Sequence, residues 1–375
     1  MLTLVLMVVL VALVFEYING FHDTANSIAT VVATKVLSPM QAVALAASTN
    51  LIGALWGTAV AKTIASGLID AGVVDVTSQL ILCALLGGIV WNLITWWLGL
   101  PSSSSHALIG GLVGAALAAA SNDFDAIIFS APAEPWYKSA GVLWKVIVPM
   151  FSSPLLGFAA GFLLMGLLFA IISGMASSGG PLARMARPRW VNSFFGKAQL
   201  ASAGYMGFAH GMNDAQKTMG IIALALVAAQ ADGTLDDLPG FLAFLHPSPE
   251  ALADGDIDLW IKLTCAVVMA AGTAAGGWRI IKTLGHKLVK LHPIHGFAAE
   301  ASAASVITLA SSLGIPVSTT HNISSAIMGV GTAKRFNAIR WTVVEKMIWA
   351  WILTIPMAGG VAYGLFRLIE ALGWA

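Results

Sequence analysis

The sequence predicts an all-α polytopic membrane protein made of two inverted-topology repeats, with broken helices and re-entrant half-helices. Three observations predict it: an apolar composition, membrane-length apolar stretches with asymmetric loop charges, and two polar motifs that recur in order. Of the 375 residues, 58% are hydrophobic and 10% are charged, whereas an average soluble domain has about 25% charged residues. An apolar surface of this size needs lipid as its solvent, so we expect multi-pass insertion into the inner cell membrane.

The composition also excludes several classes of partner and cofactor. The formal net charge is +1, which leaves no basic field to hold a nucleic acid. The cysteines, Cys83 and Cys265, lie inside apolar stretches without CxxC spacing, so we expect neither a metal framework nor a disulfide framework. We therefore expect the lipid bilayer as a partner, no nucleic acid and no resident cofactor.

Apolar stretches of membrane length follow one another along the chain. About 20 apolar residues cross a bilayer as a helix. Two shorter stretches, 104–120 and 317–332, each follow a proline, and their length predicts half-helices or re-entrant segments. The expected full spans are 2–34, 40–65, 79–99, 155–173, 198–230, 259–281, 295–313 and 343–369.

Charged loops indicate the orientation of these spans. Basic residues cluster at 184–197, 279–290 and 334–346, and the positive-inside rule places such loops in the cytoplasm. The stretch 231–258 has acidic residues and no Lys or Arg, so we expect it outside. Counted from these loops, both termini lie on the outer face and the two halves have opposite orientation. The predicted units are a first repeat at 1–173, a cytoplasmic linker at 174–197 and a second repeat at 198–375.

Two polar motifs occur once in each half and in the same order. Asn19–Asn26 (Asn-Gly-Phe-His-Asp-Thr-Ala-Asn) matches His210–Lys217 (His-Gly-Met-Asn-Asp-Ala-Gln-Lys). Further on, Gly99–His106 (Gly-Leu-Pro-Ser-Ser-Ser-Ser-His) matches Gly314–His321 (Gly-Ile-Pro-Val-Ser-Thr-Thr-His). In the first pair the matched positions are Gly20 with Gly211, His22 with Asn213, Asp23 with Asp214 and Asn26 with Lys217.

These residue types suit a binding site inside a membrane. Gly and Asn can break a long helix, and the freed backbone groups are tolerated only inside protein or in a wet cavity. Interrupted segments at matching places in two inverted halves indicate the binding site of a transporter. Pro followed by Ser or Thr is a helix start, and two helix N-termini aimed at one point form an anion cradle. We therefore expect helix breaks at the first motif pair and half-helix starts at the second.

Counting charges predicts what such a site must bind. Asp23 and Asp214 bring two negative charges, a bound oxyanion adds at least one more, and only Lys217 opposes them if it points inward. A helix N-terminus contributes about 0.3–1 kcal/mol and at most about 2, whereas an unpaired charge in an apolar medium costs several times more. The anion should therefore bind only together with cations, which is symport. Carboxylate and amide oxygens suit Na⁺, and a carboxylate that takes up a proton suits H⁺.

Four segments resemble the signature segments of the inorganic phosphate transporter (PiT) family. They are Gly20–Asn26, Gly211–Lys217, Pro101–His106 and Pro316–His321. The likeness covers about 15 to 370 and is closest to the bacterial low-affinity branch. It implies uptake of inorganic phosphate, free or as a neutral metal–phosphate complex, driven by an H⁺ or Na⁺ gradient, in an inverted-repeat fold that is often a homodimer.

The resemblance also has departures that bear on the coupling ion. Family patterns often read Gly-Ala-Asn-Asp, but here His22 stands where Asn is common. The second copy ends in Lys217 rather than a second Asn. Both departures favour H⁺ over Na⁺. A Na⁺ site would use Asp23, Asn26, Asn213 and Asp214.

The candidate residues follow from the motifs and from buried acids. The hydroxyl residues could instead be helix N-caps, the amides could satisfy broken backbone, and Lys217 could pair with an aspartate. We expect structural hydrogen bonds for His106 and His321, and a structural role for Glu16. The candidate phosphate ligands are Asp23, Asn26, Ser103, Ser104, Ser105, Asn213, Asp214, Ser318, Thr319 and Thr320, with Lys217 and Asn50 as further candidates. The coupling-cation candidates are Asp23, Asp214, His22, Asn213, Gln216 and Glu300.

The leading hypothesis is a secondary active transporter that imports phosphate by alternating access around a midplane site. Phosphate would be preferred to sulfate if Asp23 or Asp214 accepts the proton of HPO₄²⁻, which sulfate lacks. The alternatives are a passive anion channel and a symporter of another oxyanion such as sulfate. A hydrolase using His22 and Asp23 lacks a nucleophile motif and a metal constellation, so we do not expect an enzyme.

Overall fold

The structure is a computed structural model that describes residues 1–66 and 68–373. The regular structure of this part is helical, apart from two isolated β-bridges that join Ile69 to Ile127 and Ala131 to Ala140. Helices satisfy their own backbone hydrogen bonds, which a chain in lipid requires. Residues 374 and 375, the last two of the predicted second repeat, lie outside the described residues, as does residue 67 of the first.

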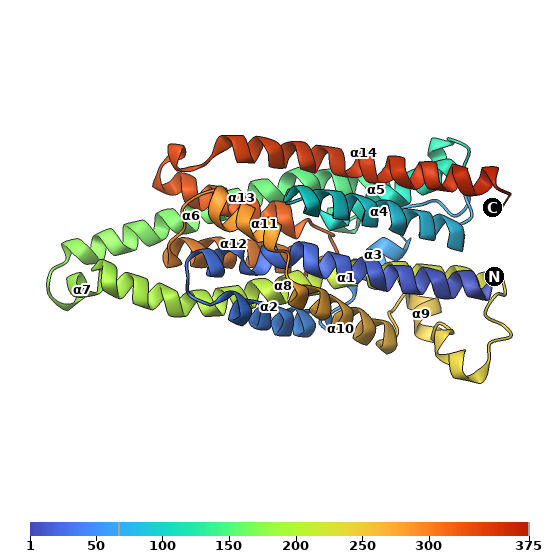
Figure 1. Cartoon of the computed structure of the whole chain (residues 1–375), viewed down its shortest axis with the longest axis horizontal. Coiled ribbons are helices and arrows are strands. Elements are labelled where there is room, and N and C mark those ends of the chain that lie inside the picture. Colours follow the sequence, from blue (N-terminus) through green and yellow to red (C-terminus); the bar gives the residue numbers. More distant parts are fainter. Residues whose placement is uncertain (67, 374–375) are drawn as a thin grey trace.

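The helices form two series, one before and one after α7 (Figure 1). In residues 1–173 they are α1 (Leu2–Ala33), α2 (Pro39–Ala54), α3 (Ala59–Ser66), α4 (Ser78–Leu98), α5 (Ser104–Ala119) and most of α6 (Val148–Ser177). After α7 (Gly180–Met185) come α8 (Pro188–Ala231), α9 (Pro249–Asp254), α10 (Leu259–Ala275), α11 (Trp278–Lys282), α12 (Pro293–Ser312), α13 (Thr319–Lys334) and α14 (Trp341–Ala371). A π-helical turn at Leu143–Ile147 leads into α6, and another at Thr283–Lys287 follows α11.

Several helices are long and apolar enough to cross a membrane. Among the described residues four meet this condition by length and composition: α1, α4, α6 with its leading turn (Leu143–Ser177), and α14. The count rises to five if Gly240–Asp254 and α10, which meet at 108°, form one broken span. The predicted spans 198–230 and 295–313 form α8 and α12 but do not meet the condition. Both carry polar residues in their middle, among them Asp214, Lys217 and Glu300. The chain is a multi-pass membrane protein.

Two predicted spans and the predicted linker differ from expectation. The stretch 40–65 is divided into α2 and α3, and 259–281 is divided into α10 and α11. The linker 174–197 is mostly helical, because α6 continues to Ser177 and prolines start α7 and α8. Proline is well accommodated in the first turn of a helix, where its missing N–H has no partner to lose.

The expected helix breaks at the first motif pair are wrong. Helices α1 and α8 run without interruption through Asn19–Asn26 and His210–Lys217. The motif glycines serve close packing instead. A Cβ on Gly20 would lie 2.4 Å from the Met269 carbonyl oxygen of α10, and one on Gly211 would lie 2.2 Å from the Asn50 carbonyl oxygen of α2. The breaks occur in the neighbouring helices rather than in the motif helices.

The helix starts predicted from the second motif pair are confirmed. Helix α5 begins at Ser104 and α13 at Thr319, each three residues after the motif proline. Ser103 and Ser318 are the N-caps, and their hydroxyls accept hydrogen bonds from the backbone N–H groups of His106 and His321, both at 3.2 Å. All these residues are buried, so both helices start inside the protein.

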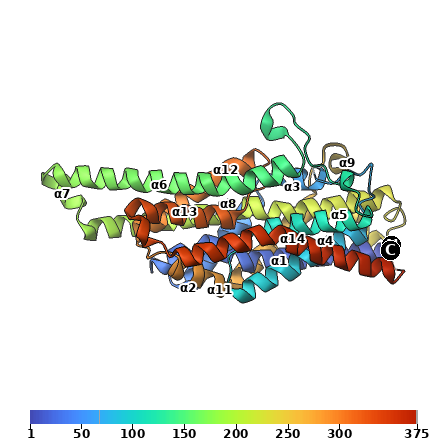
Figure 2. The ribbon, with the colours of Figure 1, turned by 90° about the horizontal axis from the view of Figure 1, so that it is seen from above.

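The packing of the two halves is reciprocal. Helix α1 packs against α10, and α8 against α2; α5 packs against α14, and α13 against α6. Helices α1 and α8 lie side by side and run in opposite directions, and both chain ends lie at one end of the molecule (Figure 1). The α6–α7–α8 hairpin projects from the opposite end in both views (Figure 2).

We predict that Gly211→Ala destabilises the protein by about 1–3 kcal/mol, because its methyl group would be forced into the backbone of α2. The measurement is thermal unfolding in detergent. Gly174→Ala in α6 is the matched control, because a Cβ there meets nothing within 4 Å. Equal melting temperatures for the two variants would contradict the close approach of α8 and α2.

Candidate functional site

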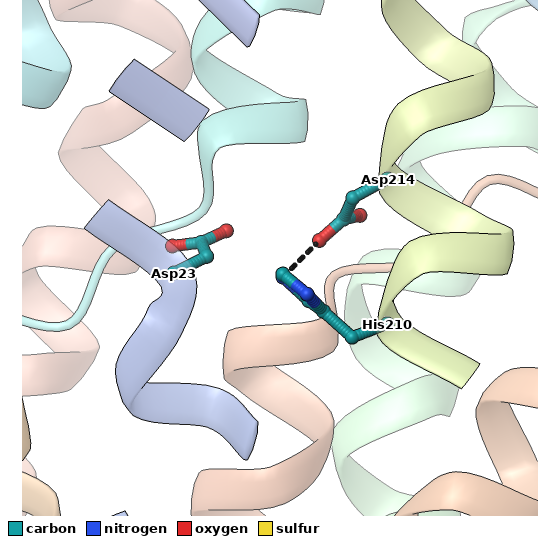
Figure 3. Close-up of side chains that lie close together, drawn as sticks. All are labelled: Asp23, His210 and Asp214. Atoms are coloured by element: carbon teal, nitrogen blue, oxygen red, sulfur yellow. Dashed lines mark ion pairs between the residues drawn. The ribbon is translucent and has the colours of Figure 1, made fainter. Parts of the chain in front are cut away.

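The two motif aspartates meet at the centre of the protein. Asp23 comes from α1 and Asp214 from α8, and their carboxylates face one another across a short gap with His210 beside them (Figure 3). One donor atom from each of these three residues lies within 4.8 Å of the others. The exposed fractions of Asp23 and Asp214 are 2% and 0%. The sequence predicted that these acids converge, and the structure brings them together.

Each aspartate is bound by a hydroxyl from the half-helix of its own half. Ser104 donates to Asp23 Oδ2 at 2.8 Å, and Thr319 donates to Asp214 Oδ2 at 2.7 Å. Ser104 and Thr319 occupy matched positions, the first residues of α5 and α13. Buried charged groups are costly unless they are paired or hydrogen-bonded. The half-helix starts therefore hold both carboxylates in place.

The next hydroxyl on each half-helix contacts the opposite half. Asn26 of α1 donates from Nδ2 to Thr320 at 2.9 Å and to Thr319 at 3.2 Å. Lys217 of α8 donates to Ser105 of α5. Thr320 and Ser105 are matched positions, as are Asn26 and Lys217. The two half-helices are thus connected to both motif helices at one point.

Lys217 points inward, which the sequence left open. Its ammonium pairs with Asp214 Oδ1 and lies 3.2 Å from the Val317 carbonyl oxygen. Asp23 has no lysine or arginine partner among the described ion pairs. With one fixed cation for two carboxylates, the site has a formal charge of −1 when both histidines are neutral. That an added oxyanion binds only together with a further cation stays a prediction, and this charge is the basis for it.

A histidine lies beside each aspartate. His22 Nδ1 is 2.6 Å from Asp23 Oδ1, and His210 Nε2 is 3.0 Å from Asp214 Oδ2. His22 was among the sequence candidates, but His210 was missed. The sequence feature that could have identified His210 as a site residue is its spacing of four residues from Asp214. This spacing puts both side chains on one face of a helix. Asn50, a predicted ligand candidate, lies behind His210, with its Oδ1 3.2 Å from His210 Nδ1.

Asn213 lies beside Asp214, on the side of α13. Its Nδ2 donates to Asp214 Oδ1 at 2.9 Å and to the Val317 carbonyl at 2.8 Å. Its Oδ1 accepts from Ser311 at 3.2 Å. Asn213 is therefore fully engaged with the protein, whereas the buried Oδ1 of Asn26 has no hydrogen-bond partner among the described residues.

Gln216 and Glu300 lie in other hydrogen-bonded clusters. Gln216 Oε1 accepts from the backbone N–H of Val60 at 2.8 Å, at the start of α3, so its amide satisfies the break between α2 and α3. Glu300 accepts from Gln199 at 3.0 Å and from Ser202 at 2.5 Å, and also from Thr30. The structure does not bring either candidate to the aspartate pair.

His106 and His321 do not form the expected side-chain hydrogen bonds. Their rings pack against each other with centroids 4.8 Å apart, and His321 also stacks on Trp351. Nδ1 of His106 and both ring nitrogens of His321 lack a hydrogen-bond partner within the part of the chain that is described. These two residues join the half-helices to each other by ring packing just behind the hydroxyl positions.

The arrangement can bind a tetrahedral oxyanion with hydroxyl and amide donors while its carboxylates bind a proton or a cation. Carboxylate, amide and hydroxyl oxygens suit Na⁺, and the group Asp23, His210 and Asp214 has donor types that also suit divalent transition metals. Ser102 Oγ lies 3.5 Å from Nε2 of His22, whose Nδ1 contacts Asp23. The Ser102 hydroxyl donates to Thr95 at 2.8 Å, however, so its proton is not directed at the histidine as nucleophilic catalysis would need.

We predict that Asp214→Asn is more destabilising than Asp23→Asn. Removing one partner of a buried ion pair leaves an uncompensated charge and costs about 3–5 kcal/mol, and only Asp214 is paired with a lysine. Thermal unfolding of both variants in detergent tests this. Equal losses of stability would show that Lys217 is not the dominant partner of Asp214.

The sequence is similar to known proteins of one family. The model of the phosphate transporter family matches residues 19–362. A Mycobacterium bovis protein named "Probable low-affinity inorganic phosphate transporter" is 44% identical over 372 residues, covering 99% of this chain and 79% of that protein. A Bacillus subtilis protein of the same name is 40% identical, covering 98% of this chain and 99% of that protein.

The fold is also found among solved structures. One described as "The sodium-dependent phosphate transporter" matches with a TM-score of 0.76 and 21% identity, covering 99% of this chain and all of that one. At that identity the match shows the fold alone. The family match and the two relatives show that this chain belongs to the phosphate transporter family and is a membrane transporter rather than an enzyme.

Proposed function

We propose that the chain is a secondary active transporter that imports inorganic phosphate across the inner cell membrane, coupled to a cation gradient. The observation that carries the proposal is the meeting of Asp23 and Asp214 with the hydroxyls that begin α5 and α13. The printed names of the relatives support phosphate as the substrate. We further propose a homodimer, on the resemblance to the family.

The proposed architecture is a pair of inverted repeats, at 1–173 and 198–375, joined by the segment 174–197. The reciprocal packing supports it, because exchanging the two halves converts the α1–α10 contact into the α8–α2 contact and the α5–α14 contact into the α13–α6 contact. The opposite directions of α1 and α8 support inversion (Figure 1). With the basic segment 184–197 in the cytoplasm, both termini lie on the outer face.

In the proposed site, phosphate is held by Ser104, Ser105, Thr319 and Thr320 and by Asn26, at the starts of the half-helices. Ser103 and Ser318 cap these helices, so they act on phosphate through the position of the backbone. Asn213 orients Asp214. Alternating access would then require the contacts between the halves, Asn26 with Thr320 and Lys217 with Ser105, to open on one side at a time.

The proposed coupling ion is H⁺, with Na⁺ as the alternative. Asp23 has a histidine rather than a lysine as its neighbour, so a proton or a cation can supply the missing positive charge there. The fold match is to a protein described as sodium-dependent, which keeps Na⁺ as an alternative. Phosphate carried as a metal complex is a second form of the substrate, because Asp23, His210 and Asp214 offer donors for a divalent ion.

The first prediction concerns coupling. In proteoliposomes, an inward proton gradient alone should drive concentrative uptake of radiolabelled phosphate. Asp23→Asn should abolish this uptake, because the carboxylate that binds the coupling proton is gone. Asp237→Asn, in the exposed segment that follows α8, is the matched control and should transport normally. Uptake driven only by a Na⁺ gradient would show that the coupling ion is Na⁺ rather than H⁺. Flux that only follows the phosphate gradient, without trans-stimulated exchange, would indicate a channel.

The second prediction concerns specificity. Sites that hydrogen-bond a group of the substrate reject analogues without it by roughly 10⁴–10⁵. If an aspartate accepts the proton of HPO₄²⁻, unlabelled sulfate should compete for phosphate uptake only at a very large excess. Competition assays in the same proteoliposomes measure this ratio. Sulfate uptake as fast as phosphate uptake would refute phosphate recognition by a carboxylate.

A further inference from the structure

One matched pair of the repeat differs in charge where the structure is otherwise alike. Asn26 and Lys217 occupy equivalent positions on α1 and α8, and both are buried. Each donates to the second hydroxyl of the opposite half-helix, Asn26 to Thr320 and Lys217 to Ser105. The same geometry therefore holds a neutral amide in one half and an ammonium in the other.

The Lys217 ammonium is surrounded by oxygen atoms of the kinds that bind hard cations. It contacts a hydroxyl of Ser105, a carboxylate oxygen of Asp214 and the carbonyl oxygen of Val317. Hydroxyl, carboxylate and carbonyl oxygens are the ligands of hard cations in proteins. An ammonium has three N–H donors, and these three contacts use all of them. Lys217 therefore has no donor left for phosphate.

The first half has the complementary arrangement. Asn26 uses its Nδ2 on Thr319 and Thr320. Its Oδ1 is buried without a hydrogen-bond partner among the described residues. Asn26 follows Asp23 by three residues on α1, and Thr320 contacts both residues. Nearly all buried polar groups find a partner, so an orphaned oxygen needs an explanation. The Asp23 carboxylate and the free amide oxygen of Asn26 have no fixed cation beside them. They are therefore suitable ligands for a cation that binds and dissociates during transport.

We propose that the Lys217 ammonium permanently fills, in the second half, the position of a coupling cation. The transported cation then binds only on the side of Asp23 and Asn26, and the chain moves one cation fewer per phosphate than a site with asparagine in both halves. The inference rests on the proposed function, since it assigns the cation positions of the same site.

An ordinary structural ion pair is the competing explanation, because a buried pair can be retained without any role in ion binding. The two explanations differ in what replaces the lysine. If the ammonium fills a cation position, Lys217→Asn vacates it and supplies an amide oxygen like that of Asn26. A cation from solution should then restore the stability and the phosphate uptake that depend on the ammonium. If the Lys217–Asp214 pair is only structural, added cations should not restore either property.

The first experiment measures binding without transport. Purified Lys217→Asn in detergent, without phosphate, should melt roughly 5 °C or more below wild type in Na⁺-free buffer, and Na⁺ should raise its melting temperature more than it raises that of wild type. Lys217→Met, which removes the charge without supplying an oxygen, should show no extra Na⁺ effect. An equal Na⁺ effect on wild type and Lys217→Asn would overturn the proposal. So would failure of both Lys217→Asn and Lys217→Gln to fold at high Na⁺.

The second experiment measures coupling in proteoliposomes. Lys217→Asn should lose phosphate uptake from Na⁺-free medium by at least roughly tenfold, regain it with Na⁺, and carry one more positive charge per phosphate than wild type. An unchanged ratio of charge to phosphate would refute the assignment. If wild type takes up no phosphate under any gradient, the proposed function fails, and the melting experiment still decides the role of Lys217.

Discussion

The burial of two carboxylates inside a membrane protein is the constraint on which the rest of the structure depends. Asp23 and Asp214 are almost completely shielded from solvent, where an unpaired acid is very costly. Each needs side-chain donors, since the helix backbone is already used, and neighbours on its own helix supply part of them. The structure supplies the others by starting two helices inside the protein, so that Ser104 and Thr319 reach the carboxylates. The proline that precedes each start, the capping serine and the ring packing behind it all follow from that requirement.

The starts of α5 and α13 and their capping serines could be predicted because they depend on local sequence. Pro followed by hydroxyl residues specifies a helix start wherever it occurs, and the repeat showed which residues had to meet. Glycine is different, since it can break a helix or let another backbone approach. At Gly20 and Gly211 the choice was decided by α10 and α2, whose positions no local pattern reveals. The breaks at the motifs were wrongly expected for that reason.

The same limit applies to the missed and misplaced site residues. His210 lay within a recognised motif, but its role depends on Asn50, which fixes its ring from α2. Gln216 has the right chemistry for an ion ligand, yet its amide is taken by backbone that a break in another helix leaves free. Glu300 is a buried acid with a complete set of donors of its own. In each case the partner comes from a segment distant in sequence, and only the fold shows it.

The reciprocal packing of the halves has a consequence for how the protein is made. Helix α5 lies against α14, which is the last helix of the chain. During synthesis α5 therefore enters the membrane long before its main neighbour exists. Ser104 at its start already has Asp23 of α1 to contact, but Ser105 does not yet have Lys217. Helix α13, in contrast, finds α6 already in place. The packing of α5 can thus be completed only after the last helix is made, and a chain interrupted before residue 341 holds one half-helix with its main neighbour and one without.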